Sequence, residues 1–196
     1  MNLATGVFAY VDQRYQMATR KVVGEAATLL TSPPVFAGDF NPEWLAGNQF
    51  IYLDLHGQPG SVYLYSGPDE LWAALALNTV RNARLGGAVV FATSCYLTES
   101  PFLPIFLQAG ARAVIAGAGA NWGTRGRVSG AQLLAMIVLK LLRSGLPVER
   151  ALPEAKRRLG LSWHRVRDRQ ATEDALKFEL FKKEITSYGR NGSKKE

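Results

Sequence analysis

Residues 51–57 read IYLDLHG and residues 89–95 read VVFATSC, and these two stretches decide the fold. Both are short runs of aliphatic, β-branched and aromatic residues, which is typical of strands buried on both faces of a parallel sheet. The first run ends at His56-Gly57 and the second at Ser94-Cys95. Because open parallel sheets bind ligands beyond the carboxyl ends of their strands, we expect His56 and Cys95 at a ligand-binding edge.

Outward from these stretches, apolar runs alternate with amphipathic segments. Expected strands cover residues 6–11, 49–55, 88–93 and 111–116, with a small strand or hairpin arm at 61–65 and an edge strand or helix at 176–180. Expected helices cover residues 12–30, 68–83, 102–109, 133–142 and 148–159. The alternation predicts an α/β fold with a mainly parallel central sheet between helices.

The size and composition are those of one folded domain. The chain has 196 residues, 47% of them hydrophobic and 20% charged, which excludes a wholly disordered or collagen-like chain. We expect a single domain over residues 1–188 and a frayed polar tail over residues 189–196. The sequence has no run of about 18 apolar residues and no secretory signal at its start. A cytoplasmic protein without membrane association is therefore expected.

The chain contains few cysteine and histidine residues. One cysteine and two histidines can form neither an intrachain disulfide nor the usual closed zinc site. A thiol needs a base to become a thiolate nucleophile, and imidazole is the side chain whose ordinary pKa lies nearest neutrality. We expect Cys95 and His56 to form such a pair, with no metal and no cofactor. A structural role for a small buried cysteine is the alternative.

The order of the motifs resembles that of caspase-like cysteine peptidases, most closely the bacterial CHAT group. The His-Gly strand end at residues 51–57 and the Ser-Cys strand end at residues 89–95 carry the resemblance. A helix, the strand-like run 109–115, a loop with Trp122, the helix 133–142 and an Ala-rich helix at 151–159 follow in the same order. The resemblance covers about residues 6–181 and implies a caspase-like three-layer α/β/α sandwich.

The resemblance also implies roles for individual residues. Cys95 is the expected nucleophile, His56 the general base, and the N–H groups of Gly57 and Cys95 the oxyanion hole of a cysteine endopeptidase that acts through a thioester. The substrate-binding candidates are Asp54, Ser94, Asn121 and Trp122. Asp54 precedes His56 by two residues and so shares its strand face, where it orients the imidazole, lines an acidic pocket or is simply a solvated or hydrogen-bonded strand residue.

The sequence departs from two members of that superfamily. The caspase signature Gln-Ala-Cys-x-Gly is replaced by TSCYL at residues 93–97, which argues against an Asp-specific caspase. Metacaspases carry an Asp two residues before the cysteine to receive a basic side chain, and Thr93 stands there in this chain. A basic cleavage preference set from residue 93 is therefore not expected.

The basic residues are concentrated in the second part of the chain, which leaves functions other than peptide cleavage open. Residues 1–120 carry 6 Lys/Arg and 8 Asp/Glu, whereas residues 121–196 carry 17 and 8. The basic cluster is a solvated helix face or a docking surface for an acidic protein or nucleic acid; it comprises Arg143, Arg150, Lys156, Arg157, Arg158, Arg165, Arg167 and Arg169. Nucleic acid is the less expected partner, because no RNA- or DNA-binding motif is present.

The expected partners follow from these readings. They are a protein or peptide substrate, a regulatory protein and a second copy of the chain paired through an edge strand. The alternatives to a peptidase are a catalytically inactive caspase-like scaffold or binding module and, less expected, a nucleic-acid-binding domain that uses the basic C-terminal part.

Overall fold

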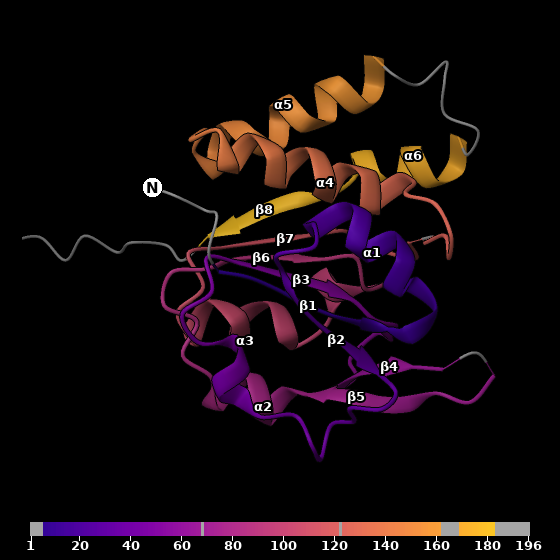
Figure 1. The fold of residues 1–196 in the computed structure, drawn as a ribbon, viewed down its shortest axis with the longest axis vertical. Helices are drawn as coiled ribbons and strands as arrows, with labels where there is room; N and C mark the ends of the chain where they lie inside the picture. The colour runs from indigo at the N-terminus through magenta and orange to yellow at the C-terminus, as the bar shows by residue number, and fades with distance from the viewer. Residues whose placement is uncertain (1–5, 68, 122, 162–168, 183–196) are drawn as a thin grey trace, which may run out of the picture.

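The computed structural model describes residues 6–67, 69–121, 123–161 and 169–182. A six-stranded sheet with the order β2-β1-β3-β6-β7-β8 forms the middle layer (Figure 1). Its strands are β1 (Val7–Asp12), β2 (Thr28–Ser32), β3 (Phe50–Asp54), β6 (Val89–Ala92), β7 (Ala113–Ala116) and β8 (Glu179–Lys182). Only β8 runs antiparallel to its neighbour, so the predicted α/β fold with a mainly parallel sheet is confirmed.

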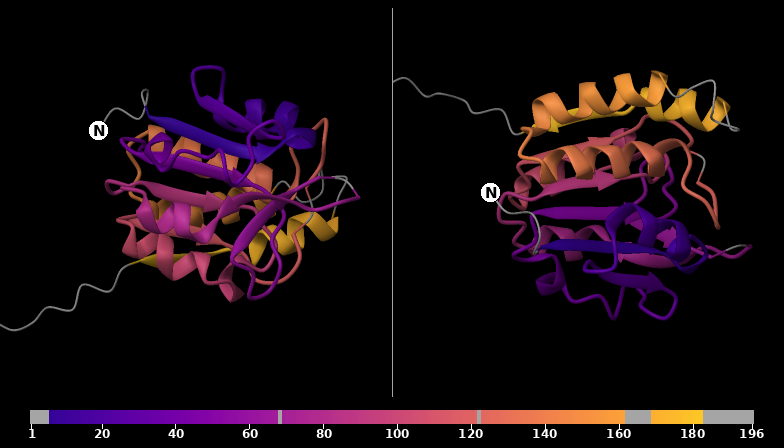
Figure 2. Two further views of the ribbon diagram at one scale, coloured as in Figure 1. Left: turned by 90° about the horizontal axis from the view of Figure 1, so that it is seen from below. Right: turned by 45° about the horizontal axis from the view of Figure 1, so that its top comes forward.

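Helices cover both faces of this sheet. One face carries α1 (Gln16–Val23), α4 (Gly130–Arg143), α5 (Val148–Leu161) and α6 (Arg169–Leu176); the other carries α2 (Leu77–Asn82) and α3 (Phe102–Gln108) (Figure 1). Strands β2 and β8 form the two edges of the sheet, so β1 lies next to one edge and β8, the last described element, forms the other (Figure 2). None of the helices in the described ranges is long and apolar enough to cross a membrane.

The central strands are apolar except for Asp12 and Asp54 at the ends of β1 and β3, because both faces of the strands are buried. In β3, Phe50 and Tyr52 join the core under α4, whereas Ile51 and Leu53 join the core under α3. The same alternation runs through β6, where Phe91 belongs to the α4 side. Phe178, which lies between α6 and β8, stacks on Phe91 with ring centroids 5.5 Å apart. The C-terminal segment is thus packed directly against a central strand.

The expected helix over residues 12–30 is wrong. The segment forms a short 3-10 turn at Gln13–Tyr15, α1 at Gln16–Val23 and then the edge strand β2. Gly24 adopts φ +87 and its N–H donates to the Arg20 carbonyl, which ends α1. The residues beyond it, TLLTS at 28–32, pair in parallel with β1. The helical spacing of apolar residues therefore extends beyond α1 into β2 by coincidence and does not indicate a longer helix.

The expected helix over residues 68–83 is also largely wrong. Residues Trp72–Ala76 form β5, which pairs antiparallel with β4 (Tyr63–Ser66), and α2 follows as a single short helix. The small strand expected at 61–65 is confirmed as β4 of this hairpin. Leu and Ala favour helices, but here the pairing of neighbouring strands overrides that weak preference.

The remaining expectations agree with the structure to within a few residues. The strands at 6–11, 49–55, 88–93 and 111–116 and the helices at 102–109, 133–142 and 148–159 are confirmed. Residues 176–180 were expected as either a strand or a helix. They contain the end of α6 at Leu176 and the start of β8 at Glu179. Helix α6 itself was not predicted. The expected tail, residues 189–196, lies outside the described residues.

Candidate active site

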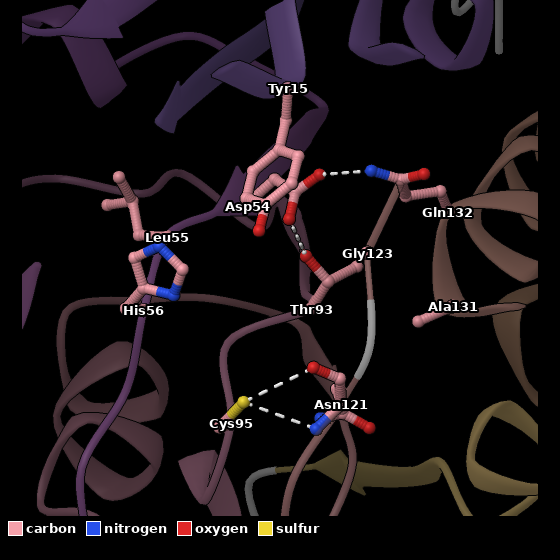
Figure 3. A pocket seen from close by; sticks show the side chains of 10 residues that line it. All are labelled: Tyr15, Asp54, Leu55, His56, Thr93, Cys95, Asn121, Gly123, Ala131 and Gln132. Atoms are coloured by element: carbon pink, nitrogen blue, oxygen red, sulfur yellow. Dashed lines mark hydrogen bonds between the residues drawn. The ribbon is translucent and has the colours of Figure 1, made fainter. Parts of the chain in front are cut away.

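Two neighbouring parallel strands bring His56 and Cys95 to one edge of the sheet. In the register of β3 and β6, Leu53 lies opposite Ala92, and each reactive side chain follows its strand by two or three residues. Both residues line one pocket of about 20 Å³, which holds about a single water molecule. Its lining residues are Tyr15, Asp54, Leu55, His56, Thr93, Cys95, Asn121, Gly123, Ala131 and Gln132 (Figure 3).

The thiol of Cys95 is held by the backbone of Asn121. Its Sγ donates to the Asn121 carbonyl at 3.4 Å and accepts from the Asn121 N–H at 3.2 Å (Figure 3). Burial raises the pKa of the Cys95 thiol, and the Asn121 N–H offsets part of that effect. No hydrogen bond among the described residues joins this thiol to His56. The thiol is therefore partly buried and bonded to Asn121, not to His56.

His56 is anchored through one ring nitrogen. Its Nε2 lies 2.5 Å from Nη2 of Arg14 and 3.3 Å from Oδ2 of Asp12. Figure 3 shows one ring nitrogen of His56 turned toward the side of the pocket that holds Cys95. Because Arg14 and Asp12 occupy Nε2, the nitrogen on the Cys95 side is Nδ1.

The two partners of Nε2 require different protonation of the imidazole. A guanidinium can only donate, so the contact with Arg14 needs a lone pair on Nε2 and places the proton of a neutral ring on Nδ1. A carboxylate can only accept, so the contact with Asp12 needs the proton on Nε2 and leaves Nδ1 free as a base. Arg14 is the closer partner. With Arg14 as the closer partner, the neutral His56 ring carries its proton on Nδ1 and cannot accept the Cys95 proton there. We call this arrangement of Cys95 and His56 the resting state.

Asp12 is a buried carboxylate at the carboxyl end of β1. It is 1% exposed and accepts hydrogen bonds from the Arg14 N–H, Nε and Nη2 and from the Gly67 N–H, at 2.7 to 2.9 Å. Burial by itself raises the pKa of Asp12, but the bonds from His56, Arg14 and Gly67 outweigh it and place that pKa far below its usual range. Asp12 is thus an ionised anchor for the His56 side of the pocket.

Gly57 lies against the backbone of Cys95. A Cβ atom built on Gly57 would be 2.0 Å from the Cys95 carbonyl oxygen, so no side chain fits at this position. Neither the N–H of Gly57 nor that of Cys95 donates to another residue in the described part of the chain. These two N–H groups therefore have no partner in another described residue, and that of Cys95 lies next to its own thiol.

Asp54 lines the pocket from its buried side. It is 5% exposed and accepts from Thr93 Oγ1 at 2.7 Å, Gln132 Nε2 at 2.9 Å and the Tyr52 hydroxyl at 3.2 Å. It does not bond to His56, so orienting the imidazole falls to Asp12. Of the readings that the sequence left open for Asp54, the structure shows a hydrogen-bonded residue at the end of its strand that also lines the pocket.

The other predicted substrate-binding residues are placed differently from one another. Asn121 lines the pocket, and its Nδ2 donates to the Ser94 carbonyl at 3.3 Å. Ser94 is fully buried, its hydroxyl has no partner among the described residues, and it does not line the pocket. Trp122 lies outside the described residues.

The basic cluster is partly paired. Arg157 and Arg158 both bind the Glu154 carboxylate, and Arg143 donates to the Val23 carbonyl. Arg165 and Arg167 lie outside the described residues. The arginines that are paired in this way agree with the prediction that the basic cluster is a solvated helix face.

Several residues of the site were not singled out from the sequence. Asp12 ends β1, and the rule that placed His56 and Cys95 at strand ends applies to it equally. Arg14 and Tyr15 follow it in the 3-10 turn. Gln132 carried a signal as well, because it is a polar residue at the start of an otherwise apolar helix and is 1% exposed.

The comparisons with known proteins add no relative. No protein-family model matches the sequence, and no curated protein matches it either. No group of three or more His, Cys, Asp or Glu within the described ranges has the geometry to hold a metal ion. The functional argument therefore rests on the site itself.

Proposed function

We propose that this chain is a cysteine endopeptidase of caspase-like architecture, with Cys95 as nucleophile and His56 as general base. The observation that carries the proposal is the meeting of one thiol, one anchored imidazole and two free backbone N–H groups at the ends of two paired parallel strands. The order of the sequence motifs, which resembles that of the CHAT group, supports the same reading.

The reaction begins with transfer of the thiol proton from Cys95 to Nδ1 of His56. The thiolate attacks the carbonyl carbon of the peptide, and the N–H groups of Gly57 and Cys95 donate to the resulting oxyanion. Collapse of this intermediate breaks the C–N bond, and the imidazolium gives its proton to the leaving amine. Water then attacks the thioester with His56 again as base, which releases the acid and restores the thiol.

Two features of the resting state must change for this reaction to start. The Cys95 thiol must leave the Asn121 backbone, and the Nε2–H of His56 must find Asp12 in place of Arg14. Asp12 then stabilises the imidazolium that forms when the thiol loses its proton. Asp12 and Arg14 act through His56 and are positioning residues.

The test is the alkylation rate of Cys95 by iodoacetamide between pH 5 and pH 9. Cys95 is the only cysteine, so the intact mass reports its modification without ambiguity. We expect the folded protein to react faster than the urea-unfolded protein at pH 7 and to lose this advantage in His56→Ala. A folded thiol that is protected and indifferent to His56 would contradict the proposal.

A catalytically inactive scaffold is the second candidate, and one observation favours it. The thiol is partly buried, its pKa is raised, and it bonds to Asn121 and not to His56. Buried cysteines of this kind are usually inert. The same alkylation experiment separates the two functions, because only the peptidase requires His56 to accelerate the reaction.

Removal of Arg14 is expected to activate the thiol. In Arg14→Met the donor that holds a lone pair on Nε2 is lost, so Asp12 accepts the Nε2–H and Nδ1 becomes free. We expect alkylation at pH 7 to rise about fivefold, the worth of about one net hydrogen bond. Arg81→Met, an exposed arginine on α2, is the matched control and leaves the rate unchanged. A slower reaction in Arg14→Met would show that Arg14 supports the base.

A further inference from the structure

A separate cavity lies at the edge of the sheet where the central parallel strands begin. It measures about 320 Å³, which is at the lower end of the range for small-molecule sites. His56 and Cys95 follow the opposite ends of β3 and β6, and no residue lines both cavities. The lining residues are Gly47, Asn48, Gln49, Gly86, Gly87, Arg112, Leu142 and Gly145.

Backbone hydrogen bonds hold the loops around this cavity in place. The Arg112 N–H donates to the Ala88 carbonyl at 2.9 Å, which ties the start of β7 to the start of β6. The Val89 N–H donates to the Gln49 carbonyl at 2.9 Å, which ties the start of β6 to the residue before β3. The cavity is therefore already open in this structure, and a ligand of fitting size enters it without displacing a wall.

Arg112 is the only charged residue in the lining. Its side chain is exposed and forms no hydrogen bond or ion pair with another described residue. Glu149 of α5 interacts electrostatically with Arg112, but it does not line the cavity, and its carboxylate accepts from Lys182 Nζ at 3.2 Å. The planar fork of N–H donors on Arg112 is therefore available to an anion.

Other donors in the lining also lack a partner. The backbone N–H groups of Gly47, Asn48 and Gly86 do not donate to another described residue. The Oε1 of Gln49 is buried without a partner in the described part of the chain, which leaves Nε2 as the polar atom of this amide that a ligand can reach. No Asp or Glu contributes a carboxylate to the lining. The cavity therefore suits an anion better than a cation.

Glycines keep part of the wall free of side chains. Gly86 and Gly87 have φ +54 and +83, and a Cβ atom at either position would meet nothing within 4 Å. The left-handed backbone explains why this turn needs glycine. It does not explain why an arginine without a partner and an amide without a partner face the same space. A ligand that carries negative charge accounts for both.

We infer that this cavity binds the phosphate group of a small molecule, with Arg112 as its counter-charge and Nε2 of Gln49 as a second donor. A guanidinium binds carboxylate and phosphate alike, but a phosphate has three terminal oxygens that accept hydrogen bonds and so uses more of the available donors. The phosphate comes either as inorganic phosphate or as a monoester of a small molecule. This site is additional to the proposed peptidase function and does not depend on it.

The experiment is isothermal titration calorimetry at low ionic strength with inorganic phosphate and, separately, with glycerol phosphate. We expect binding, and we expect Arg112→Met to weaken it by about 10- to 100-fold, as for the loss of a hydrogen bond between charged groups. Gln49→Met removes a neutral donor and is expected to weaken binding about three- to tenfold. Tighter binding of glycerol phosphate identifies a monoester as the ligand, whereas equal or weaker binding identifies inorganic phosphate.

The matched control is Arg81→Met, which removes an exposed arginine of α2 that does not line the cavity. It takes the same charge from the protein and is expected to leave the affinity unchanged. Equal weakening by Arg81→Met and Arg112→Met would reduce the effect to general charge attraction and overturn the site. The thermal midpoint of Arg112→Met without phosphate should equal that of the wild type, because its guanidinium has no partner among the described residues.

Two further results would also overturn the inference. One is the absence of heat from the wild-type protein at millimolar concentrations of both phosphate probes. The other is tighter binding of acetate than of phosphate, which would make the site a carboxylate site. None of these measurements involves Cys95 or His56, so their failure leaves the peptidase proposal as it stands, and failure of the alkylation test leaves the phosphate site as it stands.

Discussion

Replacement of Gly57 by alanine is expected to lower the alkylation of Cys95 at pH 7 by about 100-fold or more. The added Cβ would lie 2.0 Å from the Cys95 carbonyl oxygen, so the two strand ends must move apart by about 1 Å or more. A displacement of that size between reacting groups costs about 100-fold in rate. The same movement would separate the two backbone N–H groups of the proposed oxyanion hole, which affects peptide hydrolysis and not alkylation.

A second glycine provides the control for this prediction. Gly38 has open space around its position and no left-handed φ, so Gly38→Ala is expected to leave the alkylation rate and the thermal midpoint unchanged. Circular dichroism of Gly57→Ala tests whether the sheet is intact. A folded Gly57→Ala variant with wild-type reactivity would mean that the close approach of Gly57 to Cys95 has no role in the reaction.

Replacement of Asp12 by asparagine is expected to cost about 3–5 kcal/mol of the free energy of unfolding, the usual cost of breaking a buried ion pair. The substitution removes the charge that Arg14 and His56 face and leaves Arg14 beside a neutral amide. It also removes the carboxylate that accepts the Nε2–H, so His56-dependent alkylation of Cys95 falls together with stability.

The pH dependence of this effect has a definite sign. The pKa of Asp12 in the folded protein lies far below the ordinary value of 3.8. Its contribution is therefore fully present above pH 4 and is lost as the pH falls toward the folded pKa. Urea unfolding of wild type and Asp12→Asn should differ most at pH 6 to 7 and progressively less below pH 4. A difference that stays constant from pH 7 to pH 3 would exclude a role for the carboxylate charge, and Asp39→Asn serves as the matched control.

The sequence predicts the central sheet well because its signal is local. Strands β3 and β6 are buried on both faces, so all their residues except Asp54 at the end of β3 are apolar, and each run stands out without any knowledge of its neighbours. Their shared direction then predicts that His56 and Cys95 meet. An edge strand such as β2 has no such signature, because most of its residues are only partly buried.

The anchoring of His56 could not be predicted in this way. Arg14 reaches Nε2 across 42 positions of sequence, and Gly67 completes the shell of Asp12 from 55 positions away. These contacts depend on how the 3-10 turn after β1 meets the β4–β5 hairpin, whose second strand, β5, was predicted as part of a helix. The sequence predicts that His56 and Cys95 lie at strand ends. It does not predict their hydrogen-bond partners, which come from distant parts of the chain.

The stacking of Phe178 on Phe91 has a consequence for folding of the chain during its synthesis on the ribosome. The strand that delivers Cys95 is covered by a ring encoded 87 positions later, close to the last described strand. Synthesis proceeds from the N-terminus at about 5–20 residues per second, so a ribosome-bound chain carries the thiol and the imidazole before it carries this cover. We expect the pocket that contains Cys95 and His56 to form only after the C-terminal segment has emerged, so under the proposed peptidase function the nascent chain would not yet cleave peptides.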